Sequence, residues 1–167
     1  MGKQVKKIMS DLDTHSRTTR GRVDRRVSDT SKTMARSSQC LVVSQTEPMR
    51  ELLSQSANVA GWDTVVCTDH EDGLAAFNQT RFQMAFIDLT GPGAVPNGFR
   101  DLCHTLVAQP NVLVAVCGNA TDPKEEIWAR QLGVWLYLPG VALEHAEELS
   151  AICEQAQLVA GLSAELR

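Results

Sequence analysis

From Gln39 onward, the sequence alternates between short apolar runs and longer segments with the periodicity of a helix. Each run is rich in Val, Leu, Ile or Ala, and in the segments that follow, apolar residues recur every three or four positions. Such alternation predicts strands that run parallel, with the connecting helices packed on both faces of one sheet. The five runs are Cys40–Val43, Asp63–Cys67, Gln83–Ile87, Val112–Cys117 and Val134–Leu138.

Capping and turn residues mark where several helices begin and end. Pro48 suits the first turn of the first helix, and Thr68 with Glu71 forms a capping-box pair before the second. Asp122 is placed to cap the fourth helix, and Gly133 to end it. These signals support five strands that alternate with five helices.

The predicted fold class is α/β, a doubly wound five-stranded parallel sheet with strand order 2-1-3-4-5. In that order the carboxyl ends of the first and third strands lie side by side, where ligands bind in open α/β sheets. Ser44 and Gln45 follow the first strand, Asp88 follows the third, and Cys117 ends the fourth. If the domain has a site, we expect it at this edge.

Charge divides the chain into two parts at about Ser38. Residues 1–38 carry ten Lys/Arg and four Asp/Glu, a net charge of +6, whereas residues 39–167 carry six and sixteen, a net charge of −10. The first part is rich in Ser, Thr and Arg and poor in large apolar residues, which predicts a disordered tail. We expect a folded domain over 39–161 and a short C-terminal end over 162–167.

A short amphipathic helix is predicted over residues 3–12 of the tail. Val5, Ile8, Met9 and Leu12 recur at helical spacing, with lysines interspersed. Because so short a helix is marginal in water, it is either unstable alone or a docking helix that forms on a partner. The arginines that follow suit a solvated linker or an acidic partner, nucleic acid included.

Cysteine and histidine usage gives no sign of a metal or cofactor. The five cysteines are odd in number, widely spaced and set in apolar runs, which is typical of reduced, buried thiols in a cytosolic protein. The four histidines lie far apart. No stretch reaches the roughly 18–20 apolar residues of a membrane span, and the N-terminus lacks the apolar segment of a secretory signal. We therefore expect a cytoplasmic protein with no membrane contact, no metal and no cofactor.

Four stretches together resemble the receiver domain of bacterial response regulators, a flavodoxin-like fold. They are LVVSQTEPMRELL, FQMAFIDL, GPGAVPNG and ARQLGVWLYL, within a likeness that covers about Cys40 to Gln157. The resemblance implies that Asp88 stands at the position of the phosphoacceptor aspartate. It also implies that partners meet the face of the fourth helix, fifth strand and fifth helix, which would serve a homodimer as well.

The other residues that define a receiver site are replaced. Where the family has two adjacent acids that hold Mg²⁺, this chain has Ser44 and Gln45. Where the family has a Ser or Thr after the fourth strand, it has Val116 or Cys117. The family's Lys-Pro reads Leu-Pro in YLPGV, and the only lysine beyond residue 38 is Lys124, at the start of the fourth helix.

Asp88 without these partners is a poor site for phosphoryl transfer. Mg²⁺ is usually held by one or two carboxylates plus phosphate oxygens, and losing its charge stabilisation costs several kcal/mol. The alternative interpretation is structural, since Asp at the end of a strand commonly accepts hydrogen bonds from nearby backbone N–H groups. Weak phosphorylation and contact with an unrelated ligand remain as further alternatives.

Three functions follow from this pattern, and none of them is catalytic. The first is a stand-alone pseudo-receiver that binds other proteins independently of phosphorylation. The second is a Mg²⁺-dependent phosphoacceptor using Asp88, and the third is a regulator that binds nucleic acid through its basic arm. Trp128, Trp135 and Tyr137 are candidate interface residues for a partner protein, unless Trp135 and Tyr137 pack beneath neighbouring helices.

Overall fold

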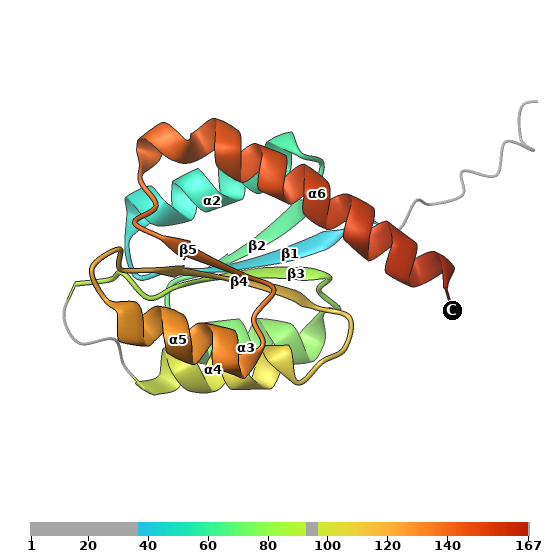
Figure 1. Cartoon of the computed structure of the whole chain (residues 1–167). Helices are drawn as coiled ribbons and strands as arrows, with labels where there is room; N and C mark the ends of the chain where they lie inside the picture. The colour runs from blue at the N-terminus through green and yellow to red at the C-terminus, as the bar shows by residue number, and fades with distance from the viewer. Residues whose placement is uncertain (1–36, 93–96, 167) are drawn as a thin grey trace, which may run out of the picture. The chain divides into compact units, whose positions relative to one another are not determined.

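The computed structural model of the chain describes residues 37–92 and 97–166, which form a single sheet with helices on both faces (Figure 1). All strands run parallel, in the order β2-β1-β3-β4-β5, as predicted. The strands are β1 (Gln39–Val43), β2 (Asp63–Cys67), β3 (Met84–Asp88), β4 (Leu113–Gly118) and β5 (Leu136–Pro139). The helices are α2 (Glu47–Val59), α3 (His70–Gln79), α4 (Asn97–Val107), α5 (Pro123–Leu132) and α6 (Ala146–Glu165), with a short 3-10 helix at Leu143–His145.

Two apolar layers hold the helices to the sheet. α2 and α6 cover one face, where Val42, Phe86 and Ala115 point, and α3, α4 and α5 cover the other, where Ile87 and Val116 point. β1, β3 and β4 are buried almost throughout, since both of their faces are covered. The carboxyl ends of these central strands are therefore held in fixed register.

Two local predictions differ from the structure. Asp69, not Thr68, caps α3, because its side chain accepts the backbone N–H of Asp72 at 2.8 Å. β5 begins two residues later than predicted, at Leu136. The reason is that Gly133 is left-handed and the backbone N–H of Val134 still bonds to Ala129, so Val134 completes the end of α5.

The limits of the domain were predicted from composition, and the structure describes only some of the residues that this prediction concerns. The predicted tail, residues 1–38 with its short helix over 3–12, lies outside the described residues apart from Ser37 and Ser38. At the other end α6 continues through residue 161 to Glu165. Within residues 37–92 and 97–166, the helices are too short or too polar to cross a membrane.

All five cysteines are buried, as predicted. Burial is the largest cause that raises the pKa of each thiol, to about 12 for Cys103 and Cys153. A thiol with a raised pKa is nearly all protonated at neutral pH, and the thiolate is the nucleophile.

We therefore expect the native protein to react slowly with iodoacetamide at every cysteine and the denatured protein to react at all five. Cys67 should be the fastest of them, because it lies on the edge strand β2 and is slightly exposed. Peptide mass spectrometry over a time course measures each rate. Three or more rapidly labelled native thiols would contradict the buried arrangement.

Candidate functional site

Four side chains form a row across the carboxyl edge of the sheet, at the position predicted for a site. Val43 of β1 pairs with Ile87 of β3, so Ser44 and Asp88 follow side by side. Asp88 then pairs with Cys117, and Cys117 with Leu138. We call Ser44, Asp88, Cys117 and Leu138 the edge row. Its geometry follows from the strand register, and its chemistry depends on what each member contacts.

Asp88 is 2% exposed, and both of its carboxylate oxygens accept hydrogen bonds. Ser44 Oγ donates to Oδ2 at 2.6 Å. The Thr90 backbone N–H and hydroxyl donate to Oδ1 at 2.9 and 2.5 Å. The bond from the Thr90 N–H is the one expected of an aspartate that ends a strand and starts a turn. The three donors are uncharged, so Asp88 is held as a buried acceptor of neutral hydrogen bonds.

Ser44 connects Asp88 to the start of α2. Its buried hydroxyl donates to Asp88 and also accepts the backbone N–H of Thr46 at 3.2 Å. The Arg50 guanidinium, from the first turns of α2, donates to the Ser44 carbonyl at 2.9 Å. Each buried side-chain polar atom in the described part of the chain has a hydrogen-bond partner, so this network is complete.

The residues around Asp88 do not fit a Mg²⁺ site. Such a site takes one or two carboxylates and open oxygens, whereas here the Asp88 oxygens are engaged by Ser44 and Thr90. Gln45 is exposed and lies over Gly91, where an added Cβ would meet its amide oxygen. Glu47 is exposed on α2. In the two described ranges, no three His, Cys, Asp or Glu side chains are grouped to hold a metal.

The other half of the edge row is apolar. Cys117 is fully buried, and burial, followed by the neighbouring Asp88 carboxylate, raises the pKa of its thiol. Leu138, which stands before Pro139, packs against the apolar layer under α2 and α6. Lys124 is exposed on the first turn of α5. The position that the receiver resemblance assigns to a lysine is therefore filled by a partly buried leucine that packs against the core.

A second buried carboxylate lies beside the end of β4. Glu125 accepts the backbone N–H of Asn119 at 2.9 Å and the Tyr137 hydroxyl at 3.0 Å. Burial, followed by this hydrogen bond, raises the pKa of Tyr137. Gly118 permits the arrangement, because a Cβ there would collide with both the Tyr137 hydroxyl and Glu125. Tyr137 and Glu125 thereby fix the β4–α5 loop to β5.

The three aromatic residues predicted for an interface are half-buried against their own domain. Trp128 of α5 lies under the Arg100 guanidinium, 4.7 Å from its ring centre, with His104 at its edge. Trp135 packs against the layer under α2 and α6, and Tyr137 bonds to Glu125. On α5 and in the 3-10 helix that follows β5, the strongly exposed apolar side chains are those of Ile127 and Leu143.

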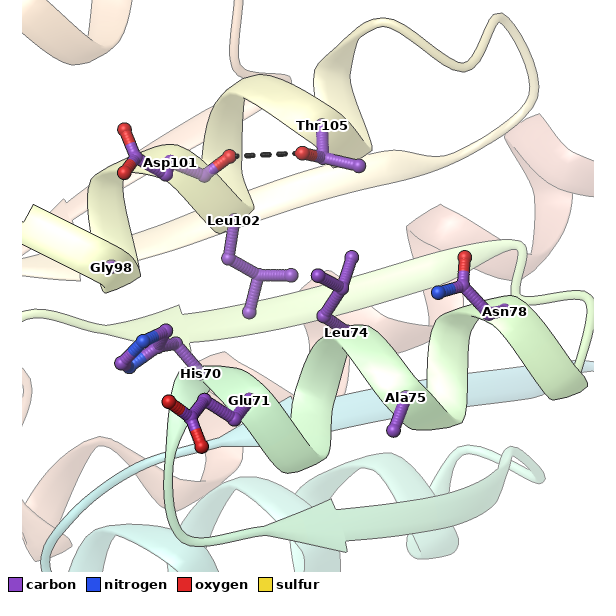
Figure 2. Close-up of a pocket in the computed structure, with 9 residues that line it drawn as sticks. All are labelled: His70, Glu71, Leu74, Ala75, Asn78, Gly98, Asp101, Leu102 and Thr105. Carbon is purple, nitrogen blue, oxygen red and sulfur yellow. Dashed lines mark hydrogen bonds between the residues drawn. The ribbon is translucent and has the colours of Figure 1, made fainter.

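A surface groove of about 480 Å³ lies between α3 and α4, away from the edge row (Figure 2). Leu74 and Leu102 point toward each other across it, and the polar side chains of His70, Glu71 and Asp101 lie toward one end. Thr105 uses its hydroxyl on the Asp101 carbonyl of its own helix. None of the edge-row residues lines this groove, so the two features are separate.

Comparison with solved structures identifies the architecture. The receiver domain of NtrX from Brucella abortus superposes with a TM-score of 0.60 at 21% identity, covering 70% of this chain and 96% of that one. The chemotaxis response regulator CheY4 of Vibrio cholerae gives 0.59 at 16% identity, with 72% and 98% covered. The BeF3-activated DrrB receiver domain gives 0.61 at 15%, with 72% and 97% covered.

The chain has the fold of a response-regulator receiver domain. No protein-family model and no curated protein sequence matches it. At these identities the structural likeness extends to the fold alone. The function of the edge row therefore depends on the contacts that its own residues make.

Three residues of the site were not anticipated from the sequence. Thr90 and Arg50 complete the network around Asp88, and Glu125 anchors Tyr137. The Asp-Leu-Thr spacing after β3 was a usable signal for Thr90, since a hydroxyl two residues after Asp can bond to it. Glu125 carried no such signal, because an acid in the first turn of a helix is usually solvated.

Proposed function

We propose that this protein is a pseudo-receiver that acts as a protein-interaction or signalling module without phosphorylation. The single observation that carries the proposal is the environment of Asp88, whose two oxygens are occupied by Ser44 and Thr90. A carboxylate must be open to attack a phosphoryl group and to share a cation with it. Asp88 instead serves to tie the ends of β1 and β3 together.

The rest of the edge row supports the same proposal. Phosphoryl transfer to a carboxylate brings anions together, and without a metal or a cation that repulsion is not offset. Neither Cys117 nor Leu138 can supply the missing charge, because a buried protonated thiol and an aliphatic side chain are neutral. Each ~1.4 kcal/mol of lost stabilisation slows the reaction about tenfold.

Beryllofluoride, a mimic of a phosphoryl group on aspartate, tests this proposal. We expect no chemical-shift changes at Ser44, Asp88 or Cys117 when beryllofluoride and millimolar Mg²⁺ are added to ¹⁵N-labelled protein. The DrrB receiver domain, which has a BeF3-activated form, is the positive control for the reagent. Saturable, Mg²⁺-dependent binding that disappears in Asp88→Asn would overturn the proposal and favour the Mg²⁺-dependent phosphoacceptor.

The partner we propose is another protein, met on the side of α5, β5 and α6. β5 is an edge strand with half-buried apolar side chains, and Ile127 of α5 and Leu143 of the 3-10 helix after β5 are exposed. Exposed apolar side chains favour contact with a second chain, a homodimer included. Nucleic-acid binding through the basic arm is a separate proposal that depends on residues outside the described part of the chain.

A further inference from the structure

The second half of α6 carries an apolar surface that the domain does not use. Leu158, Leu162 and Leu166 recur every fourth residue and are 68%, 61% and 90% exposed. Side chains at this spacing line up along one side of a helix. We call these three residues the leucine ridge. It lies on the part of α6 that extends past the ends of the strands (Figure 1).

The leucine ridge is distinct from the side of α6 that holds the helix to the sheet. The buried residues of α6 are Leu149, Cys153 and Ala156, and Ala160, on the same side of the helix, also packs against the core. A Cβ added at Gly161 would have no neighbour within 4 Å, so this part of the helix is open around Gly161. The three exposed leucines add nothing to the packing of the domain, so their presence on this part of the helix is not explained by the stability of the fold.

A hollow continues the same row of side chains toward the start of α6. It encloses about 420 Å³ and is lined in part by Val59 of α2 and by Ala146, Ser150 and Glu154 of α6. Ala146, Ser150 and Glu154 precede the leucine ridge at the same four-residue spacing. The small side chains of Ala146 and Ser150 leave a hollow, and the leucines further along the row form a ridge, which together provide a surface against which a second helix can pack.

The charges on α6 determine which class of helix can bind beside this row. α6 contains four glutamates and no lysine or arginine between Ala146 and Leu166. Two copies of α6 placed side by side would bring like charges together, which opposes pairing. A helix with lysines or arginines flanking an apolar stripe would instead meet carboxylates near both ends of the leucine ridge, at Glu154 and Glu165.

We propose that the leucine ridge and the adjoining hollow dock a basic amphipathic helix of a partner protein. The inference rests on the proposed role as an interaction module and supplies the chemical class of the partner. Leucines of the incoming helix pack against the ridge, and its cations pair with Glu154 just before the ridge and with Glu165 near its end. The interaction weakens as salt is added, because pairs at the margin are exposed and screened.

A synthetic peptide with leucines at every third or fourth position and lysines between them is the probe. We expect it to bind the full chain, measured by fluorescence anisotropy of a labelled peptide, and the double variant Leu158→Ser/Leu162→Ser to bind at least about tenfold more weakly. Leu74→Ser is the control, because Leu74 is an exposed leucine (40%) on α3, which covers the opposite face of the sheet from α6. A peptide with glutamates in place of lysines is expected not to bind.

Other outcomes of the same experiment would overturn the inference. One is that the lysine peptide does not bind, and another is that the lysine and glutamate peptides bind equally well. A third is that the ridge variant and Leu74→Ser lose the same amount of binding. Analytical ultracentrifugation showing a dimer that the ridge variant abolishes would also overturn the inference, since a second copy would then cover the ridge. Asp88→Asn should bind the peptide as tightly as the parent protein does. A peptide that does not bind would contradict the docking surface alone, whereas beryllofluoride binding would contradict the pseudo-receiver role, so the two failures are distinguishable.

Discussion

Replacing Trp62 by alanine is expected to lower the free energy of unfolding by about 3–5 kcal/mol. The Trp62 ring is buried between the end of α2 and α6, in the apolar layer that also contains Phe86. Its indole Nε1 donates to the Cys153 carbonyl at 2.9 Å, across 91 positions of the sequence. Alanine would leave a cavity and also remove the hydrogen bond that ties the α2–β2 turn to α6. Urea denaturation followed by far-UV circular dichroism measures the loss.

The variant Trp62→Phe separates the two contributions of this side chain. It retains most of the buried ring but removes the N–H donor, so we expect a smaller loss of about 1–2 kcal/mol. A Trp62→Ala variant that unfolds within about 1 kcal/mol of the parent would show that α6 does not depend on this contact. Trp62 is buried and is not part of the leucine ridge, so a folded Trp62→Ala variant should still bind the peptide. We expect peptide binding to be lost only under conditions in which that variant unfolds.

Gly118→Ala is expected to destabilise the domain by about 2–3 kcal/mol although it adds a single methyl group. The new Cβ would collide with the Tyr137 hydroxyl and with Glu125 Oε1. Tyr137 is a rigid side chain on a strand, so relief requires breaking its hydrogen bond to the buried Glu125 carboxylate. The measurement is again the free energy of unfolding, with tyrosine and tryptophan fluorescence as a local probe.

Gly161→Ala provides the matched control. Gly161 lies inside α6 with no neighbour within 4 Å, so alanine there adds helix propensity without a clash. We expect it to stabilise the protein by about 0.5–1 kcal/mol. If both substitutions proved neutral, the close approach of Tyr137 and Glu125 over Gly118 would not be a feature of the protein in solution.

The sheet was predictable from sequence because its central strands are buried on both faces. Runs such as Met84–Ile87 have no polar side chain to solvate, and only a strand covered by helices on each side explains them. The ends of elements were less accessible. Valine is a residue type favoured in strands. Val134 nevertheless lies at the end of α5, because Gly133 is left-handed and the Val134 N–H bonds to the Ala129 carbonyl.

The position of the edge row was predictable from the sequence, whereas the contacts of its residues were predictable only in part. Asp88, Ser44 and Cys117 were placed at one edge by strand order alone, and the register puts them side by side. Glu125 could not be anticipated, because its burial depends on Tyr137 reaching across from β5. Contacts between elements that are distant in sequence are set by packing, which local patterns do not record.

The edge row has a consequence for protein engineering. Its register is determined by the apolar pairs that precede it, such as Val43 with Ile87 and Ala115 with Leu136. These apolar pairs lie outside the row, so they stay in place when members of the row are exchanged. Aspartates at Ser44 and at Gln45, the next residue along the chain, and a lysine at Leu138 would place acidic and basic groups around Asp88. The scaffold offers a starting point for building a phosphate-responsive switch by design.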